Sequence, residues 1–153
     1  MIRLNPVTKL LAPTLIALCG LSAGSAMASD LQPSQVPAQV RAVLEKMYPQ
    51  AANVEWDYDK DEVHYEADFK NAGGEVEIKV SPQGKLLYLK EDKAAGDIPE
   101  AVRTAVLTQH PQARILGANR ILRDGQEWWD VGLKLDSGRH LNVYSSPDGK
   151  SLR

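Results

Sequence analysis

The spacing of hydrophobic residues changes from a helical period to a strand period early in the chain. Within residues 36–47 the apolar side chains recur every three or four positions: Val36, Val40, Val43, Leu44 and Met47. Residues at this spacing form one stripe of an amphipathic helix. Pro49 ends the predicted helix, because a proline disfavours helical geometry in the residue before it. We therefore expect one helix with a single buried face.

After this helix, apolar and polar residues alternate. Three apolar sets are separated by turn-forming residues: Val54, Trp56, Tyr58, then Val63, Tyr65, Ala67, Phe69, then Val76, Ile78, Val80. A last strand is predicted from Lys85 to Lys90. Short alternating runs joined by tight turns are typical of an antiparallel meander that buries one face.

The same order of motifs then returns. Val36-Pro37-Ala38-Gln39-Val40-Arg41 reappears as Ile98-Pro99-Glu100-Ala101-Val102-Arg103, and Ser81-Pro82-Gln83-Gly84-Lys85 reappears as Ser146-Pro147-Asp148-Gly149-Lys150. Each copy of an internal repeat is one supersecondary unit. We predict a first repeat at residues 36–92 and a second at 98–153, with residues 91–96 as the linker. In the second copy, either alternate set of residues 115–123 can face inward.

The predicted fold class is α+β, with two tandem repeats of a helix followed by about four antiparallel strands. In each repeat the helix packs on one face of the sheet and the other face looks outward. The pattern leaves two arrangements open, because the two sheets can be continuous or can abut.

The first 28 residues are predicted to be a signal peptide. Arg3 and Lys9 supply positive charge, an apolar stretch follows, and Ala26-Met27-Ala28 is a cleavage site, with cleavage after Ala28. The apolar stretch is too short to span a membrane. We therefore expect a periplasmic protein without a membrane span.

Charge and cysteine content narrow the functional classes after this cleavage. Loss of Arg3 and Lys9 changes the net charge from −2 to −4, which argues against nucleic-acid binding because that function needs a basic surface. The single cysteine, Cys19, lies in the signal peptide, so disulfides and thiolate metal sites are excluded. The first repeat is acidic and the second is slightly basic.

Several short motifs resemble the PepSY-like family, which is also described as β-lactamase-inhibitor-like. They are the Val/Ile-Pro helix start, the helix end Tyr-Pro-x-Ala, and the strands Val54-Glu55-Trp56-Asp57, Tyr65-Glu66-Ala67-Asp68-Phe69 and Glu75-Val76-Glu77-Ile78-Lys79-Val80. The match is close over 36–92 and looser over 98–153. The resemblance implies exported, non-enzymatic domains, some of which are proposed to inhibit or modulate secreted enzymes, and it carries over no catalytic residues.

The strand alternation also predicts which side chains face outward. In the first repeat these are Glu55, Asp57, His64, Glu66, Asp68, Glu75, Glu77 and Lys79; in the second they are Trp128, Asp130, Lys134, His140, Asn142 and Tyr144. Large aromatic residues on a rigid sheet are typical of protein-binding hot spots. We therefore predict partner binding by Trp128, His140, Asn142 and Tyr144. The alternative is that the other repeat or the linker covers Trp128 and Tyr144.

The acidic first repeat also offers candidate metal ligands: Asp57, Asp59, Asp61, His64, Glu66 and Glu77. Asp57, Asp59 and Asp61 have the spacing of the first ligands of a calcium loop, but Glu62 stands where that loop needs glycine. A looser carboxylate site remains an alternative, as does a histidine–carboxylate site around His64. No cofactor is predicted.

The preferred functional prediction is an exported, non-enzymatic inhibitor or modulator that binds another exported or envelope protein through its outward sheet face. The alternative is a divalent-cation sensor or carrier for Ca²⁺ or Zn²⁺ that uses the acidic face of the first repeat. A structural component of the envelope is a third possibility. The sequence identifies neither the partner nor the oligomeric state.

Overall fold

The computed structural model describes residues 31–153, which form two helices and seven strands. In chain order the elements are α1 (Ala38–Met47), β1 (Glu55–Asp59), β2 (His64–Asn71), β3 (Gly74–Val80), β4 (Leu86–Lys93), α2 (Glu100–Gln109), β5 (Arg114–Arg123), β6 (Gln126–Lys134) and β7 (His140–Ser145). Short 3₁₀ turns at Pro33–Gln35 and Ala95–Asp97 precede the helices. The predicted signal peptide, residues 1–28 with cleavage after Ala28, lies outside the described residues.

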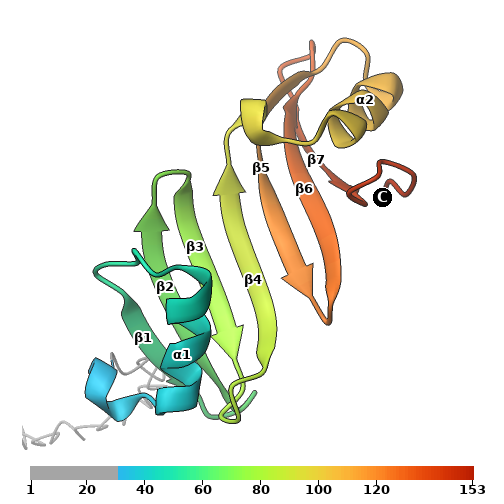
Figure 1. Cartoon of the computed structure of the whole chain (residues 1–153). Helices are drawn as coiled ribbons and strands as arrows, with labels where there is room; N and C mark the ends of the chain where they lie inside the picture. Colours follow the sequence, from blue (N-terminus) through green and yellow to red (C-terminus); the bar gives the residue numbers. More distant parts are fainter. Residues whose placement is uncertain (1–30) are drawn as a thin grey trace, which may run out of the picture.

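All seven strands belong to one antiparallel sheet whose spatial order equals the chain order (Figure 1). The predicted α+β class is confirmed, and the sheet is continuous because β4 pairs with β5, with Glu91 opposite Arg120. The predicted linker at residues 91–96 is wrong at its start. Residues 91–93 extend β4 instead, because they pair with residues 118–120 of β5.

The prediction of about four strands in each repeat holds only for the first. Residues 98–153 form three strands, and an isolated bridge joins Ser145 to Leu152. The segment 115–123, whose inward set was open, lies in β5. Leu122 faces the helices because it lies directly opposite the buried Leu89.

Each helix covers its own cluster of buried apolar side chains, and both helices lie on the same face of the sheet (Figure 1). The cluster under α1 contains Val36, Val40, Leu44, Trp56, Ala67, Phe69, Val76, Ile78, Val80 and Leu89. The cluster under α2 contains Ile98, Val102, Val106, Ala118, Trp129, Val131, Leu133 and Val143. Each fully buried Val, Leu or Ile side chain contributes about 1.5–3 kcal/mol, so these clusters are the main source of stability.

The two motifs that recur in the sequence lie against each other in both halves. Gly84 lies in a turn and has a φ of +80°. A Cβ at this position would lie 3.0 Å from the carbonyl oxygen of Gln39 in α1. Gly149, with a φ of +71°, is placed in the same way against Ala101 of α2, where a Cβ would lie 2.5 Å from the carbonyl oxygen. Glycine is needed at both turns because it tolerates positive φ and lacks the Cβ that would collide with the helix.

A polar seam, formed by Tyr48, Glu91, Lys93, Arg120 and Glu127, lies on the helix-covered face at the β4–β5 junction. The Arg120 guanidinium donates to Glu91 at 3.2 Å and to Glu127 at 2.7 Å, and the Lys93 Nζ lies 3.3 Å from Glu91. Burial raises the pKa of Glu91, but the Tyr48 hydrogen bond and the two cations outweigh it and hold that pKa below its usual value. The seam therefore joins the two halves through charged groups.

The hairpins that follow the two helices have different turns. Between β1 and β2 the turn includes Val63, whose φ is +55°. Between β5 and β6 the turn is Asp124-Gly125, with φ angles of +52° and +75°. Aspartate and glycine accept positive φ readily, whereas a β-branched valine does so only with strain. The first hairpin is therefore the less favourable of the two.

Candidate protein-binding face

The sheet face opposite the helices, called the open face below, carries neither helix of residues 31–153 (Figure 1). The strand register places all of the predicted outward residues on it. In the first half these are Glu55, Asp57, His64, Glu66, Asp68, Glu75, Glu77 and Lys79. In the second half they are Trp128, Asp130, Lys134, His140, Asn142 and Tyr144. The alternation therefore predicted correctly which residues lie on the open face. The predicted binding role of this face is a separate proposal.

On β1 to β3 the open face is acidic. One lysine serves two carboxylates, because the Lys79 Nζ lies 3.4 Å from Glu66 and 3.3 Å from Glu77. The neighbouring Asp68 has no such partner among the described ion pairs. Partial burial and the negative charges of Glu66 and Glu77 raise the pKa of Asp68 to about 6. This half of the face therefore holds excess negative charge.

On β4 to β7 the open face carries an aromatic patch, formed by Tyr88, Ile121, Trp128 and Tyr144. These four side chains line one hollow of about 270 Å³. They come from four adjacent strands, and Ile121 lies directly opposite Trp128 in the register. Tyr144 is 38% exposed, so the patch is accessible to another molecule. An apolar surface of this kind on a rigid sheet loses little conformational entropy when it is buried by a partner.

Two arginines border the aromatic patch. The Arg153 guanidinium carbon lies 4.0 Å from the centre of the Trp128 ring, and that of Arg123 lies 5.1 Å from the centre of the Tyr88 ring. Both distances are within the range of cation–π contacts. Trp128 is half-buried in this way by Arg153. The linker residues 94–96 do not line the hollow, so the predicted alternative of coverage by the linker is not what the structure shows.

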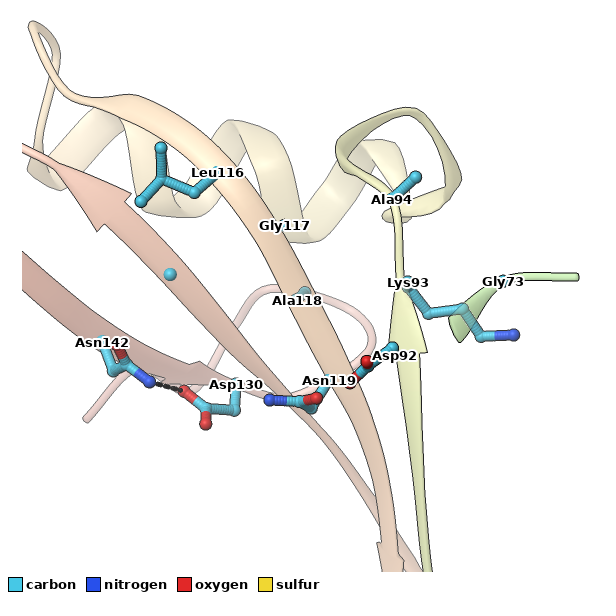
Figure 2. Close-up of a pocket in the computed structure, with 11 residues that line it drawn as sticks. Gly73, Asp92, Lys93, Ala94, Leu116, Gly117, Ala118, Asn119, Asp130 and Asn142 are labelled. Carbon is cyan, nitrogen blue, oxygen red and sulfur yellow. Dashed lines mark hydrogen bonds between the residues drawn. The ribbon is translucent and has the colours of Figure 1, made fainter. Parts of the chain in front are cut away.

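Next to the aromatic patch is a polar groove of about 400 Å³, shown in Figure 2. Its polar lining residues come from four adjacent strands: Asp92, Lys93, Asn119, Asp130 and Asn142, and the Lys93 Nζ is already paired with Glu91 at 3.3 Å. Gly117 and Gly132 face each other across β5 and β6, so no side chain fills the groove at that point. Asp130 is 8% exposed and accepts a hydrogen bond from the Asn142 amide at 2.9 Å.

The carboxylates of the groove lack a cation within the described chain. Neither Asp92 nor Asp130 is within ion-pair distance of a lysine or arginine of residues 31–153. Asp92 accepts a hydrogen bond from the backbone N–H of Glu75 at 3.2 Å. Tyr144 lies directly opposite Asp130 in the register, so the groove and the aromatic patch are adjacent. Together they offer an apolar surface beside a place for a positive charge.

The structure separates the four predicted binding residues into two places. Trp128 and Tyr144 share the hollow of the aromatic patch, and Asn142 lines the polar groove. His140 is four residues from Tyr144 along β7, about 13 Å at the rise of an antiparallel strand. It lies opposite Lys134 at the other end of the strand. His140 is therefore outside the aromatic patch.

The predicted metal ligands are also only partly together. Asp59 and His64 lie opposite each other at the ends of β1 and β2, and Glu62, which was not among the predicted ligands, completes a cluster whose ligand atoms lie within 4.8 Å of one another. Glu66 and Glu77 instead share one lysine, Lys79. His64 is 2% exposed, whereas alternation alone predicted an outward side chain.

Sequence reasoning missed Tyr88, Ile121, Arg123 and Arg153. Tyr88 has the same parity as Lys90 in the predicted last strand of the first repeat, so alternation along that strand was a usable signal. Ile121 had no such signal, because the inward set of its segment was undecided. Its placement depends on the β4–β5 register, which the sequence pattern does not contain.

Comparison with solved structures shows the fold. A BLIP-like protein from Bacteroides fragilis is 23% identical with a TM-score of 0.61, over 80% of this chain and 84% of its own. A DUF2874 family protein from Bacteroides uniformis is 24% identical with a TM-score of 0.59, over 76% and 88%. A predicted periplasmic protein from Bacteroides eggerthii is 20% identical with a TM-score of 0.59, over 77% and 88%. The chain therefore has a BLIP-like fold.

No family model and no curated protein matches the chain. The PepSY-like resemblance accordingly stays a prediction. In residues 31–153 no helix combines the length and the apolar character that crossing a membrane requires. One structural neighbour is a predicted periplasmic protein, which is consistent with the predicted location.

Proposed function

We propose that the protein is an exported, non-enzymatic binding protein that inhibits or modulates another exported or envelope protein. Contact is made by the open face, through the aromatic patch and the polar groove beside it. One observation carries the proposal: Tyr88, Ile121, Trp128 and Tyr144 form an accessible hollow on four adjacent strands of a rigid sheet.

The physical argument for binding is that the aromatic side chains lose little conformational entropy when a partner buries them. Trp128 and Tyr144 each have only two side-chain torsions, and Arg153 already packs over the Trp128 ring. A partner that buries them gains apolar contact with little loss of entropy. Aromatic anchors at the centre of an interface typically contribute 2 kcal/mol or more each, roughly a 30-fold change in affinity.

The polar groove adds a requirement on the partner. A lysine or arginine of the partner, placed beside an apolar surface, would pair with Asp92 and Asp130, which have no cation of their own in the described chain. A charged pair formed away from water contributes specificity, since a partner without the cation leaves Asp130 buried and unpaired. The acidic half of the open face favours approach of a basic surface in the same way.

The two halves are proposed to be copies of one PepSY-like unit, residues 36–92 and 98–153. In both, the Val/Ile-Pro helix start lies against the Ser-Pro-x-Gly-Lys turn, at Gly84 and at Gly149. This shared contact supports a duplication, because two unrelated units have no reason to repeat it. We place the protein in the periplasm after cleavage behind Ala28.

The test is capture of a partner by the mature protein from periplasmic extract of its host. Trp128→Ala with Tyr144→Ala is expected to weaken capture at least about 30-fold, because both anchors of the aromatic patch are lost. Met47→Ala, which removes an exposed apolar side chain on the helix-covered side, is the matched control and should not change capture. Far-ultraviolet circular dichroism checks that each variant is folded.

Two further variants divide the open face. Asp130→Asn should weaken capture if a partner cation occupies the polar groove, while His140→Ala should change it less than about fivefold, because His140 lies away from the aromatic patch. Capture that survives loss of both aromatic anchors would sink the proposal.

A further inference from the structure

The end of the β1–β2 hairpin gathers three groups with metal-binding atoms. Asp59 is the last residue of β1, His64 is the first of β2, and the two are paired in the register. Glu62 lies in the turn between them. One ligand atom from each residue lies within 4.8 Å of the other two. The cluster is separate from the aromatic patch and the polar groove, and the proposed protein binding does not use it.

The histidine of this cluster is the observation that points to a ligand. His64 is 2% exposed, and neither ring nitrogen makes a hydrogen bond in the described chain: Nε2 is fully buried and faces Glu66, and Nδ1 faces Glu62. A buried polar atom without a partner costs free energy, so such atoms are rare in folded proteins. Exposed acidic residues near a surface need no explanation, but an unpaired buried imidazole does.

Both ring nitrogens of His64 lie too far from their neighbouring carboxylates for hydrogen bonds, and the distance from Nδ1 to Glu62 suits a shared ion. Its Nδ1 lies 3.7 Å from Glu62 Oε2, and its Nε2 lies 3.8 Å from Glu66 Oε2. Hydrogen bonds between nitrogen and oxygen are about 2.7–3.2 Å long. Two ligands that each lie about 2.1 Å from a tetrahedral zinc ion are roughly 3.4 Å apart. A small inward movement of the exposed Glu62 therefore reaches the spacing that an ion requires.

The other side chains of the hairpin are held in suitable states. Asp59 Oδ1 accepts the backbone N–H groups of Asp61 and Glu62, both at 2.8 Å, which leaves Oδ2 free for an ion. Metal ligands must be deprotonated, which is the ordinary state of an aspartate carboxyl at neutral pH.

Glu66 is placed to orient the histidine. Its carboxylate lies beside His64 Nε2, and Lys79 holds it at 3.4 Å. In metal sites a ligating histidine commonly donates its second ring N–H to a carboxylate, which fixes the ring and its tautomer. Nδ1 of His64 faces Glu62 and Nε2 faces Glu66 at 3.8 Å, so a small movement of Glu66 brings it into this hydrogen bond. The pairing with Lys79 keeps Glu66 in that supporting role rather than among the ligands.

We infer that Asp59, Glu62 and His64 form a binding site for a first-row divalent cation of the Zn²⁺ class, with Glu66 as the positioning carboxylate. One imidazole and two carboxylates are the donor set that zinc accepts, and three protein ligands leave a fourth position for water. Calcium is disfavoured, because it takes six to eight oxygen ligands.

The test is calorimetric titration of the mature, untagged protein with Zn²⁺ after treatment with a chelator. We expect one ion per chain. Glu62→Gln should weaken binding at least about tenfold, because it removes one ligand from a side chain that is 73% exposed and not needed for folding. Asp61→Asn is the matched control: it removes the same charge from the same turn, and should change binding less than about twofold.

Two more variants test whether His64 is the histidine that binds zinc. His110→Ala with His140→Ala removes the other two histidines of the chain and should leave zinc binding unchanged. His64→Phe should abolish it. Absence of stoichiometric zinc binding would overturn the inference, as would an equal loss in Asp61→Asn and Glu62→Gln, which indicates diffuse attraction by acidic groups. Equal affinity for Ca²⁺ would overturn the assignment to the zinc class.

A spectroscopic readout keeps the inference testable if His64→Phe fails to fold. In the unchanged protein, Zn²⁺ should shift the nuclear magnetic resonance signals of one imidazole, assigned to His64 by comparison with the His110→Ala, His140→Ala variant. A shift of either of the other two imidazoles in its place would contradict the site. These measurements need no binding partner, so their outcome is independent of the test of the aromatic patch.

Discussion

In the half of the molecule that contains α1, the open face of the sheet is acidic, and one lysine lies near both Glu66 and Glu77. In the half that contains α2, the same face carries Trp128 and Tyr144 beside arginines. Beneath each helix the sheet is lined mainly by aliphatic side chains and one deeply buried tryptophan, Trp56 under α1 and Trp129 under α2. The helix-covered positions must fill space to a fixed density, which restricts them to a few apolar types. The open positions have no such requirement, so they are where two similar units can acquire different chemistry.

Two core substitutions, one in each apolar cluster, test whether the halves unfold as one cooperative unit. Ile78 and Leu133 are fully buried, one in each apolar cluster. Ile78→Ala and Leu133→Ala should each lower the free energy of unfolding by about 3–4 kcal/mol, because each leaves a cavity. Both should unfold in a single transition in urea, followed by tryptophan fluorescence, since the sheet is continuous across the halves.

Leu116→Ala is the control for these variants, because Leu116 is 45% exposed and its loss should change the free energy of unfolding by less than about 0.5 kcal/mol. Two separate transitions, one for each half, would show that the shared sheet does not couple them.

The next largest change in the free energy of unfolding is expected for variants in the polar seam. Arg120→Leu should lower the free energy of unfolding by about 3 kcal/mol, because it leaves the buried Glu91 with less compensation for its charge. Glu91→Leu together with Arg120→Leu should cost less than Arg120→Leu alone, since no buried charge then lacks its partner. Urea denaturation of the three proteins measures both differences. An equal or larger loss in the double variant would show that the ion pair itself supplies the stability.

The two hairpin turns offer a pair of opposite substitutions. Val63→Asn should raise the free energy of unfolding by about 1 kcal/mol, because asparagine accepts the positive φ that strains valine. Asp124→Val in the second hairpin should lower it by a similar amount, for the reverse reason. Thermal unfolding of both variants measures the difference. Should Val63→Asn be neutral, the first turn is not strained relative to the second.

The smallest effect concerns pH and the acidic half. The pKa of Asp68 is raised to about 6 in the folded state from 3.8, so the folded protein holds this proton more tightly than the unfolded chain does. Stability should therefore fall as pH rises from about 4 to about 6. Asp68→Asn should remove that part of the pH dependence, as read from melting temperatures at several pH values. Glu75→Gln, at an exposed acid of the same face, should keep it.

The sequence pattern predicted well those elements in which buried and exposed positions alternate strictly. Ile78 is buried and Glu77 is on the open face because β3 alternates strictly. The pattern was wrong at residues 91–93, where charged residues suggested a linker. Glu91 can be buried there because its partner Arg120 lies directly opposite it on β5. A rule based on local hydrophobicity cannot anticipate a charge that is neutralised by a residue 29 positions away.

The candidate sites, too, were predictable only where they depend on the local alternation of a strand. Trp128 and Tyr144 share an outward parity, so their common face followed from alternation. Tyr88 could have been found from the alternation of its strand, whereas Ile121 required the register between β4 and β5. Glu62 was missed because it lies in a turn, where neither period applies, and its position depends on the backbone hydrogen bonds to Asp59.

The order of the strands has a consequence for how the chain folds. Within the described sheet every strand pairs with its neighbour in the chain, so each pairing except that of β4 with β5 closes only a short turn and costs little entropy; β4 and β5 are joined by residues 94–113, which contain α2. Folding can then advance from β1 toward β7 as each strand docks on the last, in the manner of repeat proteins. During synthesis α1 and β1–β4 can assemble first, and the edge of β4 then serves as the template on which β5 is laid down.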